Sequence, residues 1–534
     1  MTMTRSTAWL VMMTLLLILL ACQKPVTSQD DSATATAENL TEVQPAPTEE
    51  TAESEPPPRN FARLGETRGL LQKTPSATPG YILFAPIKAE KTYLIDLDGQ
   101  VVHTWKRDYG SGTTYLRNNG NLVTTGRDPE APVFAGGGQN GWFLEYTWDG
   151  ELIWQYNFSS TDYLSHHDIA VMPNGNLLAI AWEARTVDEA IAAGRDPKSI
   201  PKAGLWPDWI IELQPDGSDD AQIVWEWHFW DHLVQDFDSS KNNYAVVADH
   251  PELLDVNRGE IPEPITQEQL DQKRAMDFAS TNSTIDNNGS DFYHVNSINY
   301  NAELDQIAIS SPGLDEIFVI DHSTTTEEAA GHSGGRWGKG GDILYRWGNP
   351  ANYARGDESD RVLGSQHDVR WIPAGYPGAG NLLVFNNNVA DAEPGYSAVL
   401  ELQTPLTDKG YQLGDSGSYG PEEPVWSHVP DDPMAFFSPF ISGAHRLANG
   451  NTMITEGASG RFFEIDPDGN TLWNYMTPYS GYLKMPDGTS PQPVGPFVYA
   501  TFRSTHIPVD HPAIAGRNLA PIEPQPPAYI PSEK

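Results

Sequence analysis

Three histidines stand at one matched position of a repeated β-hairpin unit. His167 precedes a short strand and lies seven residues ahead of the Asn-Gly-Asn turn 174–176. His294 lies seven residues ahead of the turn that begins at Asn301, and His367 opens its strand in the same way. Imidazoles that meet in space could ligate a metal ion, or could serve as nucleophile and as acid or base near neutral pH.

Carboxylates and further histidines lie close to these three in the sequence. Asp168 and Asp368 directly follow two of them and could fix the orientation of the imidazole rings. His166 could support its neighbour or face solvent. His445 falls three residues later in its strand, where Ser442 takes the matching place, so we predict a structural role for it.

The Trp-rich segment 225–236 holds His228, Asp231 and His232 close together. If the segment were helical, His228 and His232 would share one face, which is weak support for a metal site. The tryptophans favour packing instead. In a third interpretation, His228 forms part of the rim or lid of a pocket.

Hairpins of short strands must position these side chains. Asn-Gly turns close hairpins whose twist matches that of their strands. Strand pairs recur at a period of roughly 40 to 80 residues, which predicts an all-β, six-bladed β-propeller, with seven blades as the alternative. The predicted inner pairs are 113–125, 165–182, 294–310, 367–386 and 443–455. The predicted outer pairs, each with a tryptophan, are 92–106, 142–156, 208–229, 316–348, 398–428 and 461–475.

The two ends of the domain are predicted to complete the ring. Residues 497–502 would pair with 80–84 in a sixth inner pair, which removes exposed sheet edges. Because equivalent positions of successive blades converge on the axis, His167, His294 and His367 are expected to meet at one mouth of the channel. Long insertions, especially 230–290, should cap one face with short helical pieces at 231–236 and 264–279.

Composition limits the possible ligands. The chain has 534 residues, a formal net charge of −39, 16 Trp, 46 Gly and 43 Pro. Such acidity excludes a nucleic-acid-binding surface and repels anions at long range, so any anion site must be locally electropositive.

The N-terminal segment predicts a lipoprotein. Arg5 precedes the apolar run 9–20, and the segment ends at Cys22, the only cysteine. The run is shorter than the roughly 20 residues that span a bilayer, which disfavours a transmembrane helix. We therefore expect a signal peptide over 1–22, lipidation of Cys22, and a location in the cell envelope facing the periplasm or exterior. A disordered acidic tether over 23–60, a propeller over 61–520 and an extended tail over 521–534 would follow.

Several motifs together resemble the bacterial arylsulfate sulfotransferase family. They are the N-G-N hairpins, the H-H-D, H-V-N and Q-H-D motifs, and the strands EIFVIDH and NLLVFNN, and the resemblance covers about residues 75 to 505. It implies a six-bladed propeller outside the cytoplasm that moves a sulfuryl group from a phenyl sulfate to a phenol. The family needs no nucleotide donor or other cofactor and uses a transiently sulfated histidine.

The resemblance assigns roles to individual residues. It implies that His367 is the nucleophile, that His167 is the first histidine of the site, and that His294 and Asn296 form the H-x-N motif. Asn296 would donate a hydrogen bond to a sulfate oxygen. His294 or His167 would protonate the departing phenolate.

One departure from the family pattern concerns sulfate binding. The family has an arginine in the strand after H-x-N, and Pro312 stands at the matching position. Arg503 and Arg127 are the candidate substitutes for its guanidinium, and His228 is a candidate for the rim of the aryl pocket.

Two other functions stay open from the sequence. One is a metal-dependent lyase or hydrolase that uses His167, His294 and His367 as ligands. The other is a non-catalytic propeller that binds a polymer or partner, which the loss of the arginine at Pro312 would favour.

Overall fold

A computed structural model describes residues 60–529 apart from 111, 260–262, 276–278, 281, 390–391, 393 and 482–497. The chain divides into two units, Met1–Asn60 and Phe61–Lys534. The predicted signal peptide, Cys22 and all of the tether except Asn60 lie outside the described residues. The second unit holds the β-sheets.

Six antiparallel sheets form the blades of a propeller, as predicted. In five of them the strand order from the axis outward follows the chain. Three of these blades are β5 (Thr114–Leu116), β6 (Leu122–Arg127), β7 (Gly141–Tyr146) and β8 (Leu152–Asn157); β9 (Tyr163–Val171), β10 (Leu177–Glu183), β11 (Asp208–Asp216) and β12 (Asp220–His228); and β15 (Ser297–Asn301), β16 (Gln306–Ser311), β17 (Glu316–Asp321) and β18 (Tyr345–Trp347). The other two are β19 (His367–Trp371), β20 (Leu382–Asn386), β21 (Ala398–Leu402) and β24 (Trp426–His428); and β25 (Gly443–Arg446), β26 (Thr452–Glu456), β27 (Arg461–Ile465) and β28 (Thr471–Met476).

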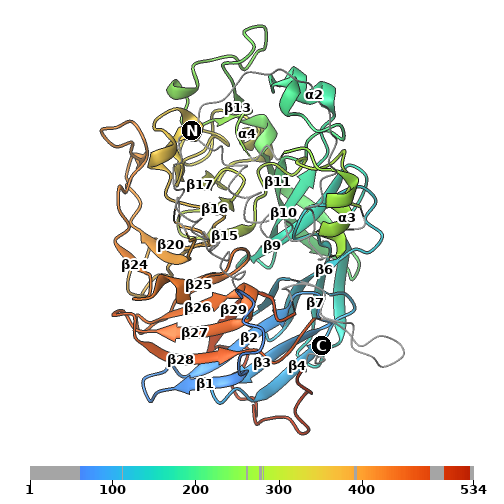
Figure 1. Cartoon of the computed structure of the whole chain (residues 1–534), viewed down its shortest axis with the longest axis vertical. Helices are drawn as coiled ribbons and strands as arrows, with labels where there is room; N and C mark the ends of the chain where they lie inside the picture. Colours follow the sequence, from blue (N-terminus) through green and yellow to red (C-terminus); the bar gives the residue numbers. More distant parts are fainter. Residues whose placement is uncertain are drawn as a thin grey trace, which may run out of the picture. The chain divides into compact units, whose positions relative to one another are not determined.

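The sixth blade joins the two ends of the domain, which confirms the predicted closure. Its inner strand β29 (Thr501–Pro508) pairs with β2 (Gly80–Pro86), followed by β3 (Lys91–Asp96) and β4 (Val101–Lys106). The C-terminal strand lies later than the predicted 497–502, and Phe497 is outside the described residues. Figure 1 shows the blue N-terminal strands beside the orange and red C-terminal ones.

A second closure was not predicted. Strand β1 (Gly69–Lys73) adds a fifth strand to the last blade by pairing with β28. Its sequence GLLQK shows no alternation, and four of its five residues are exposed at the sheet edge. A strand without a buried face gives no periodic signal in the sequence.

The Asn-Gly-Asn turns form the inner hairpins as expected. Gly175 has a φ of 96°, a conformation that glycine adopts without steric cost. The Asn174 side chain accepts a hydrogen bond from the Asn176 N–H at 3.0 Å and stabilises the turn.

One tryptophan per blade links its outer strand to the next blade. Each indole N–H donates to an acceptor on the adjacent blade or its insertions, so the set of six bonds runs round the whole ring. The donor and acceptor pairs are Trp105–Thr147, Trp154–Asp220, Trp225–Thr324, Trp347–Pro421, Trp426–Pro467 and Trp473–Leu97. This contact explains why each outer pair carries a tryptophan.

Insertions between strands hold the helices and two small sheets. The prediction of a helix within 264–279 is confirmed by α3 (Gln267–Ala275), whereas the prediction for 231–236 is wrong. There the 3-10 turn η3 (Phe229–Asp231) leads into β13 (Leu233–Val234), which pairs in parallel with β14 (Leu254–Asp255). Val234 and Leu254 are buried, so their backbone groups need partners, which each finds in the other's strand. The elements are α2 (Val187–Ala192), α3 (Gln267–Ala275), α4 (Thr326–Ala329), β13 (Leu233–Val234), β14 (Leu254–Asp255), β22 (Leu406–Thr407), β23 (Gly410–Tyr411), and 3-10 turns at Pro197–Ser199, Phe229–Asp231, Val247–Asp249, Pro350–Tyr353, Glu358–Asp360, Pro433–Ala435 and Gly457–Ser459.

The described helices are too short or too polar to cross a bilayer. At the C-terminal end, residues 521–529 have no regular structure and lie along the propeller. The Ile522 N–H donates to the Val101 carbonyl at 2.9 Å, and the Tyr529 N–H donates to the Pro478 carbonyl at 2.8 Å.

We expect Trp473→Phe to lower the free energy of unfolding by about 1–3 kcal/mol, because it leaves the partly buried Leu97 carbonyl without the donor that the fully buried indole supplies. Trp426→Phe removes the same kind of bond where it is exposed to solvent, and should cost less than about 1 kcal/mol. Guanidinium denaturation of both variants measures the difference. Equal costs would contradict a linking role for the buried indole.

Candidate active site

Neighbouring inner strands are tied to each other at the end where they begin. The Ile298 N–H of β15 donates to Asp168 of β9, and the Val369 N–H of β19 donates to Ser297 of β15, both at 3.2 Å. The Ala444 N–H of β25 donates to Asp368 at 3.0 Å. These bonds align the starts of the strands, where the three histidines stand.

The three histidines come together at this end of the axis. The rings of His167 and His294 lie 4.6 Å apart, edge to face. His294 is also close enough to His367 for its charge to lower the pKa of that residue. The predicted convergence of matched positions is therefore present in the structure.

His167 is supported by a second histidine that the sequence left ambiguous. His166 is buried, its Nδ1 lies 2.8 Å from Nδ1 of His167, and its Nε2 lies 3.0 Å from Oδ1 of Asp208. Trp182 stacks on the His166 ring at 4.0 Å. The short contact between the two Nδ1 atoms requires one of these rings to donate a hydrogen bond to the other.

Burial keeps both members of this pair neutral. It lowers the pKa of His166 to about 3. Burial and the charges of neighbouring histidines place the pKa of His167 well below its ordinary value. Burial and the charge of Asp291 raise the pKa of Asp208.

His294 has the surroundings of a proton donor. Its Nδ1 lies 2.5 Å from Oδ2 of Asp291, whose other oxygen accepts from the Trp182 indole at 2.9 Å. A carboxylate at this distance stabilises the imidazolium form. The His294 side chain is 27% exposed, against 6% and 5% for His167 and His367 as whole residues, so it is the one of the three that solvent reaches most easily.

His367 has a fixed tautomer. Its Nδ1 donates to Oδ1 of Asn387 at 2.8 Å and to the Ser365 carbonyl at 3.0 Å. The Asn387 amide is oriented by its own bonds to the Ser438 and Ile441 carbonyls. Nε2 therefore holds a lone pair, and it accepts the Ile441 N–H at 3.1 Å. Burial lowers the pKa of His367 to about 3.

The backbone of the site is strained at several points. His167 and His294 have φ of 50° and 54°, and Ile441 and Ser442 have φ of 50° and 94°. Positive φ is uncommon for residues other than glycine and is an outlier for a β-branched residue such as Ile441. Strain of this kind clusters at functional sites.

Arg503 occupies the axis beneath the histidines and is held by two carboxylates. Its guanidinium forms ion pairs with Asp168 and, at 3.0 Å, with Asp368, and it donates to the Tyr115 hydroxyl at 3.1 Å. Burial acts to lower the Arg503 pKa, but the two carboxylates outweigh it and raise the pKa. Asp168 and Asp368 thus hold Arg503 and backbone N–H groups, and the expectation that they orient the imidazoles is wrong.

Other predicted site residues have different contacts. Asn296 is fully buried and donates to the Gln366 carbonyl at 2.8 Å, next to His367, which gives it a positioning contact. Pro312 lies in the turn after β16. Arg127 ends β6 and donates to Gln139 at 3.2 Å.

His228 and His232 do not share a helical face. His228 ends β12, stacks on Trp209 and lies 3.2 Å from Glu183 rather than against any of the three histidines. His445 is half-buried, and its Nε2 accepts the His506 N–H at 3.1 Å, in agreement with the structural role predicted for it.

A glycine run covers two of the rings. The loop between β6 and β7 contains Gly136, Gly137 and Gly138. A Cβ atom on Gly137 would lie 3.4 Å from Cε1 of His294, and one on Gly138 would collide with the His167 ring. The His167 N–H donates to the Gly138 carbonyl at 2.7 Å. The run lets the main chain lie directly on both imidazoles.

An apolar cluster borders the same site. Ile441, Ala500 and Phe502 are buried together, with Ile87 and Phe440 packed against them. Phe502 lies 6.3 Å from the His167 ring, and Ile441 contacts His367 through its N–H. The histidines therefore have an apolar wall on the side of β25 and β29.

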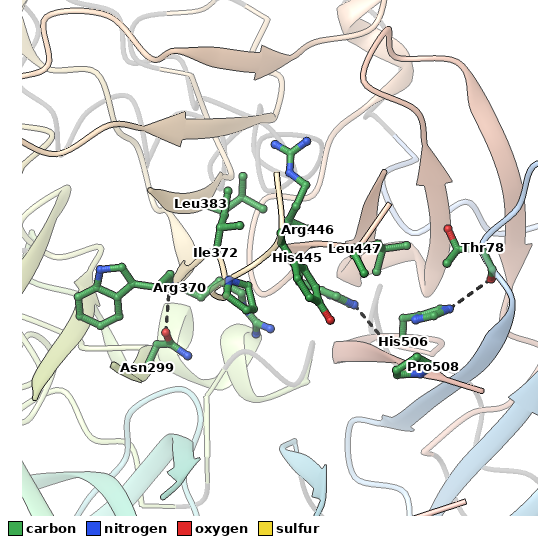
Figure 2. Close-up of a pocket in the computed structure, with 14 residues that line it drawn as sticks. Thr78, Asn299, Arg370, Ile372, Leu383, His445, Arg446, Leu447, His506 and Pro508 are labelled. Carbon is green, nitrogen blue, oxygen red and sulfur yellow. Dashed lines mark hydrogen bonds between the residues drawn. The ribbon is translucent and has the colours of Figure 1, made fainter. Parts of the chain in front are cut away.

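A cavity of about 250 Å³ lies at the opposite ends of the inner strands (Figure 2). Several of its polar groups already have hydrogen-bond partners within the protein. His506 Nε2 donates to the Thr78 carbonyl, His445 accepts from His506, and Arg370 is bonded to Asp368. The side chains that could carry out chemistry, the three histidines, lie at the other end of the axis from this cavity.

The ligand atoms of the three histidines are not spaced closely enough to share one metal ion in this structure. Among the described residues, the one group of three or more His, Cys, Asp or Glu ligand atoms within 4.8 Å of one another is His232, His332 and Asp342. The ligand atoms of His167, His294 and His367 are more widely spread.

The unfolding free energy should decline as the pH falls below about 6.5. At pH values between the ordinary pKa of histidine and the lowered pKa of about 3, the buried imidazole takes up a proton only when the chain unfolds. Acid therefore favours unfolding in this pH range. We expect His367→Gln to remove about 2 kcal/mol of the decline between about pH 6.5 and 5.

His228→Gln provides a control of opposite sign. Burial acts to lower the pKa of His228, but Glu183 outweighs it and raises the pKa, so protonated His228 stabilises the fold in acid. Its loss should steepen the decline. Denaturation curves at both pH values measure these slopes, and an unchanged slope in His367→Gln would contradict the neutral state of His367.

Similarity to solved structures is distant. A protein of unknown function from Bacteroides caccae is 11% identical over 80% of this chain and 99% of its own, with a TM-score of 0.39. A catalytically inactive virginiamycin B lyase from Staphylococcus aureus, solved with quinupristin, is 10% identical over 77% and 88%, with a TM-score of 0.33. A functionally unknown protein from Desulfotomaculum acetoxidans is 7% identical over 80% and 99%, with a TM-score of 0.35.

No curated protein matches the chain significantly. A protein-family comparison does, and its match includes the strands that carry all three histidines. The Arylsulfotransferase (ASST) family matches residues 27–473, most of the chain. Membership implies an enzyme of the sulfotransferase type. The chain belongs to the arylsulfotransferase family.

Proposed function

We propose that this protein moves a sulfuryl group from an aryl sulfate to a phenolic acceptor through a sulfohistidine on His367, without a nucleotide donor. The observation that carries the proposal is the state of His367. It is neutral, its Nδ1–H is fixed by Asn387, and its Nε2 holds a lone pair that accepts the Ile441 N–H until substrate binds. A neutral imidazole with a fixed lone pair is suited to nucleophilic attack.

In the first half-reaction, Nε2 of His367 attacks the sulfur atom. The bond from sulfur to the aryl oxygen breaks, and that oxygen takes a proton from Nε2 of protonated His294. His294 is the better acid of the two candidates because Asp291 stabilises its imidazolium, whereas burial keeps His167 neutral. The product phenol leaves, and the sulfuryl group stays on His367.

In the second half-reaction, an acceptor phenol enters. Its hydroxyl gives a proton to His294 while its oxygen attacks the sulfur, and the bond from sulfur to Nε2 breaks. His294 is then protonated again and His367 is free, so the cycle is ping-pong and needs no external acid.

The transferring group resembles metaphosphate, with charge spread over three oxygens. The guanidinium of the family pattern is replaced by Pro312, and Arg503 is paired with two carboxylates. The Ile441 N–H is placed to serve instead. It contacts Nε2 of His367 in the free protein, and a small shift of the strained Ile441–Ser442 backbone would direct it to a sulfuryl oxygen.

The apolar wall supports an aromatic substrate. Phe440, Ile441 and Phe502 border the His367 and His167 side of the site. An aryl ring packed there would lose apolar surface to the protein while its sulfate group faces His367. A strongly acidic protein also disfavours a highly anionic nucleotide donor.

The proposed location is the cell envelope. The segment that ends at Cys22 would be cleaved to leave a lipidated N-terminus, and the acidic segment 23–60 would connect the anchor to the propeller. Phenols and sulfate esters outside the cytoplasm would then be its substrates.

Intact mass spectrometry after brief exposure to 4-nitrophenyl sulfate at neutral pH tests the nucleophile. We expect an adduct of one sulfuryl group that maps to His367, disappears on addition of phenol, and is missing in His367→Ala. His445→Ala, which removes an inner-strand histidine at the other end of the axis, should retain the adduct. Folded wild-type protein that releases no nitrophenolate would instead support the binding-propeller alternative.

Asp291→Asn tests the acid. Without the carboxylate, the His294 imidazolium is less stable, so kcat/KM for phenyl sulfate should fall about 10–100-fold. The loss should be much smaller for 4-nitrophenyl sulfate, since nitrophenolate leaves without full protonation. Asp286→Asn, at an exposed carboxylate paired with Lys202, is the matched control. Equal losses for both donors would reduce Asp291 to a structural role.

A further inference from the structure

We propose that His232, His332 and Asp342 form a binding site for a divalent transition-metal ion of the zinc type, separate from the sulfotransferase site. The three residues come from the segment after β12, the loop after α4 and the residues before β18. Nδ1 of His232 lies 3.1 Å from Oδ1 of Asp342, and Nδ1 of His332 lies 2.7 Å from the same oxygen.

The hydrogen bonds of His232 leave one position that needs a cation. Its Nε2 lies 2.9 Å from the Ala329 carbonyl, which can only accept, so Nε2 carries the proton. In a neutral imidazole Nδ1 then holds a lone pair, and this lone pair faces a carboxylate oxygen. Two acceptors at 3.1 Å repel each other unless a positive charge lies between them. His232 is fully buried, and Asp342 is nearly so.

The ligand set suits a zinc-type ion. Imidazole and carboxylate groups are its usual ligands, with bonds of about 2.0–2.2 Å, so ligand atoms of a tetrahedral ion lie about 3.3 Å apart. The atoms here lie within 4.8 Å of one another. The His332 side chain is 61% exposed, which leaves room for a water ligand.

The supporting contacts are those that metal ligands require. A ligating histidine usually donates its second ring N–H to a carbonyl or carboxylate, as His232 does to Ala329. Trp227 stacks on His232 at 5.3 Å and donates to the Gly341 carbonyl at 2.7 Å, which fixes the ring next to Asp342. A bound ion would hold three insertion segments together at the rim of the propeller.

The test uses metal-free, tag-free full-length protein titrated with Co²⁺ by visible absorption and with Zn²⁺ by calorimetry. We expect one equivalent to bind, with a Co²⁺ spectrum of tetrahedral type and a rise in the thermal midpoint with Zn²⁺. His332→Ala, at an exposed side chain, should weaken binding at least tenfold and abolish the rise in the midpoint.

Two control variants distinguish this site from others. His250→Ala removes a histidine that lies 3.0 Å from Glu252 in a simple pair, and should bind as wild type does. His294→Ala should also bind normally, because the catalytic histidines take no part. Unchanged binding in His332→Ala, weakened binding in His294→Ala, or no stoichiometric binding by the wild type would each overturn the proposal, and none of these outcomes bears on the sulfohistidine.

Discussion

A buried guanidinium between two carboxylates is the interaction on which the rest of this structure depends. Arg503 is held by Asp168 and Asp368, and a buried charge is tolerated only when its partners satisfy it. The same two carboxylates accept hydrogen bonds from neighbouring strands, so the network reaches every inner strand of the ring. Its members are Tyr115 of β5, Asp168 of β9, Ile298 of β15, Asp368 of β19, Ala444 of β25 and Arg503 of β29. Because β29 arrives from the C-terminal end, the network forms only when the propeller closes.

This network places the histidines without touching their ring nitrogens. His167 and His367 each precede one of the carboxylates, so fixing Asp168 and Asp368 on the axis fixes both backbones at its mouth. The rings are then oriented by other groups, Asp208 through His166 and Asn387 directly. Separate supports for backbone and ring allow the imidazoles to stay neutral. A carboxylate in direct contact with His367 would instead favour its protonated form, which has no lone pair for attack.

The features of this arrangement that repeat from blade to blade were predictable from the sequence. The contacts that occur only once were not. The matched positions of His167, His294 and His367 and the tryptophan of each outer pair recur with the blades, so one sequence contained several copies of the same signal. Asp291 and Asn387 occur once, and their roles depend on a fold that brings them to the rings. Residue type alone was misleading for Asp168 and Asp368, since an aspartate beside a histidine can turn to either side of the strand.

The loss of the family arginine at Pro312 need not prevent catalysis. The protein attracts an anionic substrate only weakly in its ground state. Its net charge is −39, and the Arg503 guanidinium next to the histidines is paired with the two carboxylates of Asp168 and Asp368. Rate depends on what is stabilised more in the transition state than before it. In the proposed sulfuryl transfer the charge that grows is on the departing aryl oxygen, and the group that would meet it is the His294 imidazolium, whose Nδ1 lies 2.5 Å from Asp291. Such a site binds the sulfate donor weakly but neutralises the leaving oxygen strongly. It would therefore have a low affinity for the donor and still turn it over. In the proposed reaction the same weakness would ease release of the sulfated product, which is itself an anion.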